Sequence, residues 1–353
     1  MAIAMGSRVG VALLSFAHGH QGAWARTIQQ RPDAGVVAVW DDDAQRGSAA
    51  AARLGVEFVP RLDAVLARSD VDAVTICAEN AKHADLAVAA ARAGKHIMMQ
   101  KPMATTAADC DAIVAAVAAA KVKYMQSFNL RFDPLHEAIK EIVDSGRLGR
   151  ISIVRRRHSH HFAIDPAERQ RVLWWMADPE RSGGGALMDE GAHAALWFVW
   201  MFGAPVSVSA EVITRIPDLP VEDNAVLLYR WAEGQLGVHQ TSWTEVAALS
   251  TVEIYGDRGS LVATGTDIAS TRVMPAGTPP LQVWTVEQGA WTQPAIELVR
   301  ARSDVVAGPF IDCIVHDTPS PVPAEWGRAA VEMVLGGYQS ARDGRRVTLP
   351  LPR

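Results

Sequence analysis

The stretch that decides the fold is Val9-Gly10-Val11-Ala12-Leu13-Leu14-Ser15-Phe16-Ala17-His18-Gly19-His20. Its first half is an unbroken apolar run, which is typical of a strand that is buried on both faces, as strands of parallel sheets are. A short loop follows, and Gly22–Gln30 then has the composition of a helix. The succession of strand, tight loop and helix predicts the start of a parallel sheet wound with crossover helices.

The same alternation continues through the first part of the chain. Alanine-rich stretches with high helix propensity separate further apolar runs. We expect the strands at Val9–Leu14, Val36–Trp40, Ala73–Cys77, His96–Met99 and Lys123–Ser127. The pattern predicts an α/β domain with a doubly wound, Rossmann-type sheet over residues 1–127.

The pattern changes after Ser127. One helix is expected over 134–145, and strand-like segments joined by short turns then dominate. They lie at Ile151–His158, Val206–Ile213, Ala225–Trp231, Gln235–Trp243, Ser250–Tyr255 and Ser260–Thr264. Short turns favour antiparallel neighbours, so residues 128–353 are expected to form an α+β domain with a large, open, mainly antiparallel sheet. A late helix over 325–342 is expected to pack back on the first domain.

Composition excludes several classes of function. The chain has 353 residues, 49% hydrophobic and 21% charged, and a net charge of −5. Without a basic patch we expect neither nucleic acid nor a membrane surface as partner. The longest uncharged run, Ala194–Ala210, is too short to span a bilayer. Three widely spaced cysteines and the lack of a secretion signal predict a cytoplasmic protein without a disulfide framework.

The loop after the first strand stands where a dinucleotide site would have the fingerprint Gly-x-Gly-x-x-Gly. Ser15, Ala17 and His20 replace the three glycines, with Phe16 and His18 between them. Asp41 ends the second strand about 20 residues further on, where a carboxylate accepts from a ribose 2′-hydroxyl and repels a 2′-phosphate. We therefore expect NAD as the preferred cofactor, with NADP open. The alternative is that Asp41 belongs to a run that caps the next helix.

The third principal strand and its neighbour end on polar residues that should face the cofactor crevice, because ligands of open α/β sheets bind at the carboxyl ends of strands. Asn80 and His83 follow the third strand, although Asn80 could equally cap the next helix. Gln100 and Lys101 follow the strand in Lys95-His96-Ile97-Met98-Met99-Gln100-Lys101-Pro102. A lysine at such a buried strand end is a candidate for proton transfer, and an ordinary loop lysine is the alternative.

A second chemical motif lies in Ser182-Gly183-Gly184-Gly185-Ala186-Leu187-Met188-Asp189-Glu190-Gly191-Ala192-His193. On the expected helix Asp189 and His193 lie one turn apart on one face. A carboxylate that accepts from one imidazole nitrogen supports the ring as an acid or base through the other. Together with Lys101 this pair could remove a hydroxyl proton while the adjacent carbon gives up a hydride.

The order of several motifs resembles the Gfo/Idh/MocA family of NAD(P)-dependent oxidoreductases. The motifs are Gln100-Lys101-Pro102, Ala78-x-Asn80-x-x-His83, the glycine run through His193, Val221-Glu222-Asp223-Asn224, Ile254-Tyr255-Gly256-x-x-Gly259 and Tyr338-x-Ser340-Ala341-x-x-Gly344. The resemblance implies hydride transfer between the nicotinamide and a secondary hydroxyl of a sugar, inositol or related polyol. It also implies that Lys101, Asp189 and His193 are the catalytic group, and that the second domain's sheet forms homodimers or homotetramers.

Two departures from the family pattern stand out, because the glutamate before the lysine is Gln100 here and the glycine fingerprint is altered. Substrate contacts are expected from Arg131, His158, His160, Trp174 and Trp175. His158 and His160 share a strand face but His161 does not, and further ligands at zinc spacing are not evident, so no metal is predicted. The alternatives are redox-neutral glycoside cleavage or elimination with tightly held NAD, a non-catalytic dinucleotide sensor, and a metal hydrolase using His158, His160 and His161.

Overall fold

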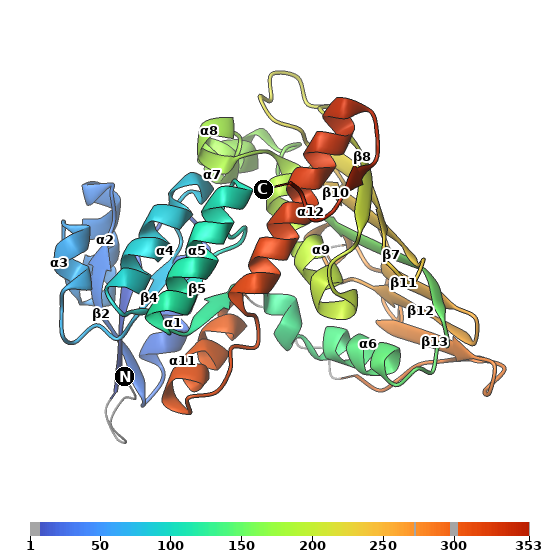
Figure 1. The fold of residues 1–353 in the computed structure, drawn as a ribbon, viewed down its shortest axis with the longest axis horizontal. Helices are drawn as coiled ribbons and strands as arrows, with labels where there is room; N and C mark the ends of the chain where they lie inside the picture. Colours follow the sequence, from blue (N-terminus) through green and yellow to red (C-terminus); the bar gives the residue numbers. More distant parts are fainter. Residues whose placement is uncertain (1–7, 272, 297–302, 353) are drawn as a thin grey trace. The chain divides into compact units, whose positions relative to one another are not determined.

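The computed structural model describes residues 8–271, 273–296 and 303–352. The chain forms two compact units (Figure 1), Met1–Phe132 with Ala301–Arg328, and Asp133–Arg300 with Ala329–Arg353. The first unit therefore extends past the predicted boundary at residue 127 and takes in a segment near the end of the chain. The predicted late helix is α12 (Ala324–Asp343), of which residues 324–328 belong to the first unit and the rest to the second.

The first unit contains a six-stranded sheet in the order β3-β2-β1-β4-β5-β6. All of its pairings are parallel, and the central strand β1 is buried at every position. The strands are β1 (Val9–Leu14), β2 (Ala34–Trp40), β3 (Glu57–Phe58), β4 (Ala73–Ile76), β5 (His96–Met99) and β6 (Tyr124–Gln126). The predicted Rossmann-type sheet is confirmed, with β3 as the strand that the sequence analysis missed.

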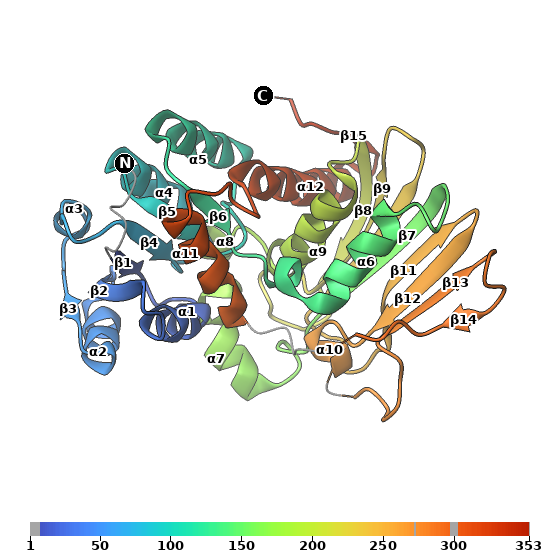
Figure 2. The ribbon, with the colours of Figure 1, turned by 90° about the horizontal axis from the view of Figure 1, so that it is seen from below.

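Helices cover both faces of this sheet (Figure 2). The helices are α1 (His20–Gln29), α2 (Ala44–Leu54), α3 (Leu62–Leu66), α4 (His83–Arg92), α5 (Ala107–Ala120) and α11 (Ala307–Val315), with the short 3₁₀ turns η1 (Asn80–Lys82), η2 (Asn129–Phe132) and η3 (Ser303–Val306). Helix α11 packs beside α1, and α4 packs beside α5. Because the strands are parallel, the loops after β1, β4 and β5 lie at the same carboxyl edge of the sheet, where such folds place ligands.

The second unit contains a nine-stranded sheet in the order β14-β13-β12-β11-β7-β10-β9-β8-β15. The strands are β7 (Ile151–Ser159), β8 (Ser207–Ile213), β9 (Asn224–Arg230), β10 (Leu236–Ser242), β11 (Ser250–Gly256), β12 (Gly259–Thr264), β13 (Leu281–Thr285), β14 (Trp291–Thr292) and β15 (Val347–Thr348). Its pairings are antiparallel except that β7 and β10 run parallel. The predicted mainly antiparallel sheet is confirmed, and β13 to β15 were not predicted.

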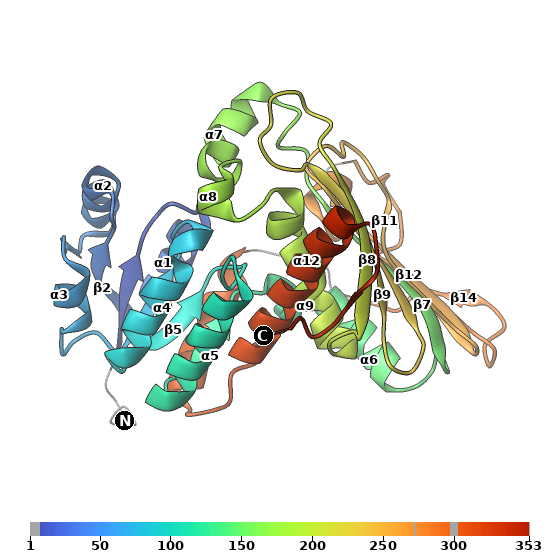
Figure 3. The same ribbon diagram turned by 45° about the horizontal axis from the view of Figure 1, so that its top comes forward.

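One face of this sheet is covered by helix α9 (Ala186–Phe202), which packs against β10, β7 and β9. Along β9 the residues alternate, so that Ala225, Leu227 and Tyr229 are buried while Val226 and Leu228 are exposed. Figure 3 shows α7 (Pro166–Met176) and α8 (Pro179–Ser182) in the chain that leads to α9. The unit also contains α6 (Pro134–Asp144), the short α10 (Ile268–Thr271) and the C-terminal part of α12.

Gly191 leaves room for the Leu187 side chain one turn earlier on α9. A β-carbon on Gly191 would approach that side chain to 2.7 Å, whereas it would lie at an ordinary contact distance of 3.5 Å from His239 of β10. Glycine in a helix interior costs roughly 1 kcal/mol relative to alanine, and here it avoids that close approach within the helix. All residues of α9 from Ala186 to Met201 are buried.

Two histidines are buried in their neutral form in this core. Burial, together with the nearby charge of Arg156, lowers the pKa of His239 to about 3. Burial likewise holds the pKa of His136 well below its usual value. The His136 ring accepts a hydrogen bond from the Trp197 indole at 3.1 Å, and His239 lies 3.0 Å from the Tyr229 hydroxyl. Both rings must gain a proton when the chain unfolds in acid.

We predict that the free energy of unfolding falls as the pH drops below about 6.5, the ordinary pKa of histidine. A folded-state pKa below the unfolded value gives stability that is present above 6.5 and lost as the pH falls toward 3. Each such histidine contributes a slope of up to about 1.4 kcal/mol per pH unit. Urea unfolding followed by tryptophan fluorescence between pH 7.5 and 5 measures this slope.

His239→Gln should reduce the slope, whereas His316→Gln, at an exposed position, should leave it unchanged. A free energy of unfolding that is constant from pH 7.5 to 5 would contradict the prediction.

Candidate functional site

The loop after β1 takes the backbone path of a glycine loop without the glycine. Ser15 has φ of 67°, in the left-handed region that non-glycine residues rarely adopt. This conformation costs on the order of 1 kcal/mol. The Ser15 hydroxyl accepts a hydrogen bond from the Ala17 N–H at 3.2 Å, which supports the turn. The first fingerprint position therefore retains the required conformation.

The start of α1 fits a pyrophosphate. Gly19 is its N-cap residue, and the preceding His18 accepts the His20 N–H on Nδ1 at 3.2 Å and the Gln21 N–H on its carbonyl oxygen at 3.3 Å. A β-carbon on Gly19 would meet nothing within 4 Å, so the backbone there borders open space. The positive end of the helix dipole favours anionic groups at such a position. His20, the first residue of α1, and the preceding His18 flank this position.

Asp41 has more partners than the sequence analysis foresaw. Its carboxylate is buried and accepts hydrogen bonds from the backbone N–H of Phe16 at 2.8 Å and of Asp43 at 3.1 Å. Arg46 of α2 binds it through Nε at 2.9 Å and Nη2 at 2.6 Å. Asp43, not Asp41, caps α2. Asp41 thus holds the loop after β1, and the predicted ribose contact stays a prediction that requires Arg46 to rearrange.

The two predicted site residues after β4, Asn80 and His83, are both buried. Asn80 begins η1 and is buried, and Lys82 rather than Asn80 is the N-cap residue of α4. The His83 ring has no exposed surface, and its nitrogens lie 2.9 Å from the Pro102 carbonyl oxygen and 3.1 Å from that of Ala78. His83 was expected to face the cofactor crevice. In the structure its ring instead joins the loop after β4 to the segment that follows Lys101.

Gln100 links the two departures from the family pattern. Its side-chain oxygen accepts from the Lys101 backbone N–H at 3.0 Å, which sets the orientation of the amide. Its NH₂ group therefore faces the rings, 2.8 Å from His20 Nδ1 and 3.0 Å from His18 Nδ1. A glutamate would offer those nitrogens an acceptor instead of a donor. Ser15, Asp41, Gln100 and Lys101, here called the strand-end cluster, are all buried, with Lys101 only 3% exposed.

The second unit gathers another set of polar groups on α9. Asp189, Glu190 and His193 are each more than nine-tenths buried. The His158 ring of β7 lies 4.8 Å from the His193 ring, and its Nε2 lies 3.4 Å from the Glu190 carboxylate. The Trp243 indole N–H, just past β10, donates to Asp189 Oδ2 at 3.0 Å. We call Asp189, Glu190, His193, His158 and Trp243 the helix cluster.

Sequence reasoning found three members of the helix cluster and missed Glu190 and Trp243. Glu190 occupies the variable position between Asp189 and Gly191, so its burial was the missing information. Trp243 ends a predicted strand, and the packing of α9 on β10 brings it to Asp189. The guanidinium of Arg156 also approaches His158 Nδ1 at 2.9 Å, from a position that is 1% exposed.

The other predicted substrate residues divide between core and surface. Trp175 is buried with Leu173, Met176 and Trp243 in an apolar cluster, whereas Trp174 is 47% exposed with Arg181 near its ring. His160 lies just beyond β7, is buried and stacks near His161. Arg131 lies in η2 of the first unit. Trp175 is a core residue here. A substrate contact remains a prediction for Trp174, His160 and Arg131.

Tertiary contacts also position the start of α9. The Glu222 carboxylate accepts from the backbone N–H of Gly185 at 2.9 Å and of Leu187 at 2.9 Å, and from the Tyr338 hydroxyl at 2.7 Å. A β-carbon on Gly184 would approach the Tyr338 oxygen to 2.1 Å. A β-carbon on Gly185 would approach the Glu222 carbonyl oxygen to 1.9 Å. The glycine run therefore leaves room for the Tyr338 side chain and for the backbone of Glu222, whose carboxylate caps the helix.

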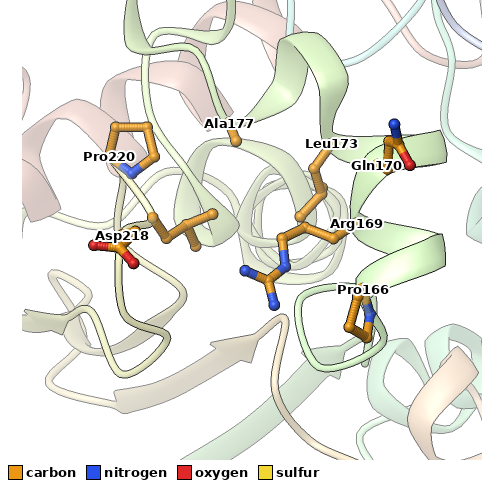
Figure 4. Close-up of a pocket in the computed structure, with 8 residues that line it drawn as sticks. Pro166, Arg169, Gln170, Leu173, Ala177, Asp218 and Pro220 are labelled. Carbon is orange, nitrogen blue, oxygen red and sulfur yellow. The ribbon is translucent and has the colours of Figure 1, made fainter.

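A surface cavity of about 400 Å³ lies in the second unit, between α7 and the loop before β9. Figure 4 shows Arg169 and Leu173 from α7, with Asp218 and Pro220 from the loop. None of the predicted site residues lines it. Among the described residues, no group of three metal-binding side chains comes together, and no helix is long and apolar enough to cross a bilayer.

A parallel sheet with a tight loop between β1 and α1 and a buried strand-end lysine is the architecture of a dinucleotide-binding enzyme of the Rossmann class. It is joined to a second unit with its own polar cluster. The sequence profile of the oxidoreductase family with an NAD-binding Rossmann fold matches residues 10–128, and the family's C-terminal domain matches residues 136–262. The chain belongs to the Gfo/Idh/MocA family of oxidoreductases.

Named relatives are similar over large parts of the chain. Inositol 2-dehydrogenase of Rhizobium meliloti is 30% identical over 68% of this chain and 71% of its own length. Levoglucosan dehydrogenase of Pseudarthrobacter phenanthrenivorans is 29% identical over 55% of each chain, so the match spans little more than half of that enzyme. The structure of GenD2 from gentamicin A biosynthesis, in complex with NAD, is 26% identical, with a TM-score of 0.79 over 99% of both chains.

We predict that Glu222→Ala lowers the free energy of unfolding by about 2–3 kcal/mol, because it leaves buried backbone N–H groups of Gly185 and Leu187 without their acceptor. Urea unfolding at pH 7 measures the loss. Asp165→Ala provides a matched control, since Asp165 caps the exposed start of α7 through Ala167 and Glu168. Its loss should be about 1 kcal/mol. Equal losses in both variants would refute the special role of Glu222.

Proposed function

We propose that this oxidoreductase moves a hydride between a nicotinamide and a secondary hydroxyl carbon of a neutral sugar, inositol or related polyol. The observation that carries the proposal is the helix cluster, where α9 presents a buried carboxylate and a buried imidazole beside the His158 ring. Inositol 2-dehydrogenase and levoglucosan dehydrogenase among its relatives support the class of substrate.

In the proposed mechanism Lys101 and His193 handle the hydroxyl proton. An amine and an imidazole are both groups that can accept or donate a proton, and both side chains are more than nine-tenths buried. Asp189, held by the Trp243 indole, orients His193 or the substrate hydroxyl. The nicotinamide supplies the hydride acceptor, and the start of α1 with Ser15, Phe16, Ala17, His18 and His20 would hold its pyrophosphate.

The preference for NAD over NADP is part of the proposal. Asp41 and Asp42 place two carboxylates at the end of β2, which disfavour a 2′-phosphate. Arg46 binds both carboxylates and Lys82 binds Asp42. These cations reduce the repulsion without removing it, because Lys82 is shared with a third carboxylate, that of Glu79, at 2.9 Å.

The charges of the helix cluster favour an uncharged substrate. Asp189 and Glu190 are acceptors that suit hydroxyl groups and would repel a carboxylate or phosphate at close range. The neighbouring cations already have partners. Arg156 contacts His158 and Thr266, and Arg157 binds Glu245 at 2.7 Å and Asp267 at 3.1 Å. We therefore expect neutral polyols to react better than sugar acids.

The open face of the nine-stranded sheet supports an oligomer built from copies of this chain. Exposed apolar side chains line neighbouring strands, including Val226 and Leu228 of β9, Leu236 of β10 and Ile153 of β7, and Leu236 pairs directly with Ile153. Contiguous apolar surface of this kind marks association sites, and a sheet face presents the same pattern to a second copy. A homodimer or homotetramer in the cytoplasm completes the proposal, and three buried free cysteines agree with a reducing compartment.

We predict that the purified protein forms NADH, seen as rising absorbance near 340 nm, when NAD and a panel of inositols, neutral sugars, glycosides and sugar acids are supplied. Lys101→Met and His193→Gln should each lower kcat at least about 100-fold, as loss of a proton-transfer group does. Lys140→Met is the matched control, since Lys140 pairs with Asp144 on the exposed face of α6 and should be unaffected. Comparing kcat/KM for NAD and NADP tests the cofactor preference.

Several outcomes would count against this function. Glycoside cleavage without net NADH would point to the redox-neutral reaction, and dinucleotide binding without turnover of any panel member would point to a sensor. Activity that is unchanged in Lys101→Met would remove that lysine from the mechanism.

Light scattering during gel filtration should show a dimer or tetramer, and Leu228→Lys should shift it toward the monomer by placing a charge on the apolar sheet face. Val286→Lys offers a control, because Val286 is 59% exposed and lies just past β13, away from the exposed apolar residues of β7, β9 and β10. A monomeric wild-type protein would overturn the proposed assembly.

A further inference from the structure

Trp243 occupies a rigid position just past the end of β10. Its side chain is fully buried. Its backbone N–H donates to the Asp223 carbonyl at 2.8 Å, and its own carbonyl accepts from the Ala163 N–H at 3.1 Å. The indole packs in an apolar cluster with Leu173, Trp175 and Met176. Backbone and ring are thus held from different sides, so the direction of the indole N–H is set by the fold.

That N–H meets the carboxylate of Asp189. Trp243 Nε1 lies 3.0 Å from Asp189 Oδ2. An indole nitrogen is only a donor, so the direction of this hydrogen bond is unambiguous. Hydrogen bonds to ionised groups in a buried site are about twice as strong as neutral ones. A flexible carboxylate on the first turn of α9 is therefore fixed by a group on another element.

We propose that Trp243 is a positioning residue, which holds the Asp189 carboxylate in the orientation that the hydride-transfer reaction needs. The inference rests on the proposed function, because it assigns Trp243 a role through Asp189. Two other indoles make comparable contacts around the same helix without touching a predicted catalytic group. Trp231 donates to the Gly203 carbonyl at 2.9 Å, at the far end of α9, and Trp197 donates to His136 at 3.1 Å.

These contacts supply a matched control. Trp243→Phe and Trp231→Phe each remove one buried indole hydrogen bond from the surroundings of α9 and keep an aromatic ring. A merely structural role predicts similar losses of thermal stability and similar kinetics for both variants. The positioning role predicts that only Trp243→Phe lowers kcat, by roughly 10- to 100-fold, the scale expected when a reacting group is misplaced. The dissociation constant for NAD, measured by fluorescence titration, should be the same in both.

A double-mutant comparison tests whether Trp243 acts through Asp189. In the Asp189→Ala background the acceptor is gone, so adding Trp243→Phe should change kcat by less than about twofold, because coupled residues are not additive. Adding Trp231→Phe should have its usual small effect. A full additional loss on adding Trp243→Phe overturns the proposal.

An independent measurement does not require activity. In protein labelled with ¹⁵N-tryptophan, Asp189→Ala should shift one indole N–H signal and speed its exchange, while the signal that disappears in Trp231→Phe stays in place. An unchanged set of indole signals overturns the hydrogen bond and hence the proposal, even if Trp243→Phe does not fold. If the wild-type enzyme turns over no panel substrate, the proposed function fails. If the wild type is active and Trp243→Phe matches Trp231→Phe, the positioning role alone fails.

Discussion

The burial of a polar first turn on helix α9 is the constraint on which the second unit depends. Asp189, Glu190 and His193 lie in a helix whose other residues are almost all apolar and buried. Buried charges and helix-end N–H groups are costly without partners. Glu222, held by the Tyr338 hydroxyl, accepts from N–H groups at the helix start, while Trp243 binds Asp189 and His158 lies against Glu190. The glycines before the helix leave room for Tyr338 and for the backbone of Glu222.

In the first unit, the candidate site residues are held by contacts among the loops at the ends of the parallel strands. Asp41 ties the loop after β1 to β2 through the Phe16 N–H, and Ser15 takes a left-handed conformation that glycine would otherwise provide. Gln100 joins Lys101 to the histidines of the same loop. The altered loop and Gln100 are therefore in direct contact, and the amide donor faces ring nitrogens of His18 and His20 that a glycine loop would lack.

The sequence analysis predicted most elements of both sheets because their patterns are strong. A strand that is buried on both faces, such as β1, is a continuous apolar run. Strand β9 is also rich in apolar residues, and these face the core and the surface in turn. It missed β3, β14 and β15, which contain two residues each and are too short for a periodic signal, and it also missed the five-residue β13. It placed the first domain boundary at residue 127, but the described residues 303–328 also belong to the first unit through contacts that no local pattern records.

By itself the sequence determined the two kinds of sheet, the family and the residues that form the candidate catalytic set, because apolar periodicity and motif spacing are local properties of the chain. Only the tertiary structure decided what surrounds those residues. The bonds from Arg46 to Asp41, from Gln100 to the histidines, from Glu222 to the start of α9 and from Trp243 to Asp189 all join distant segments. Sheet register and helix packing create such contacts, and a single sequence contains no direct signal for them.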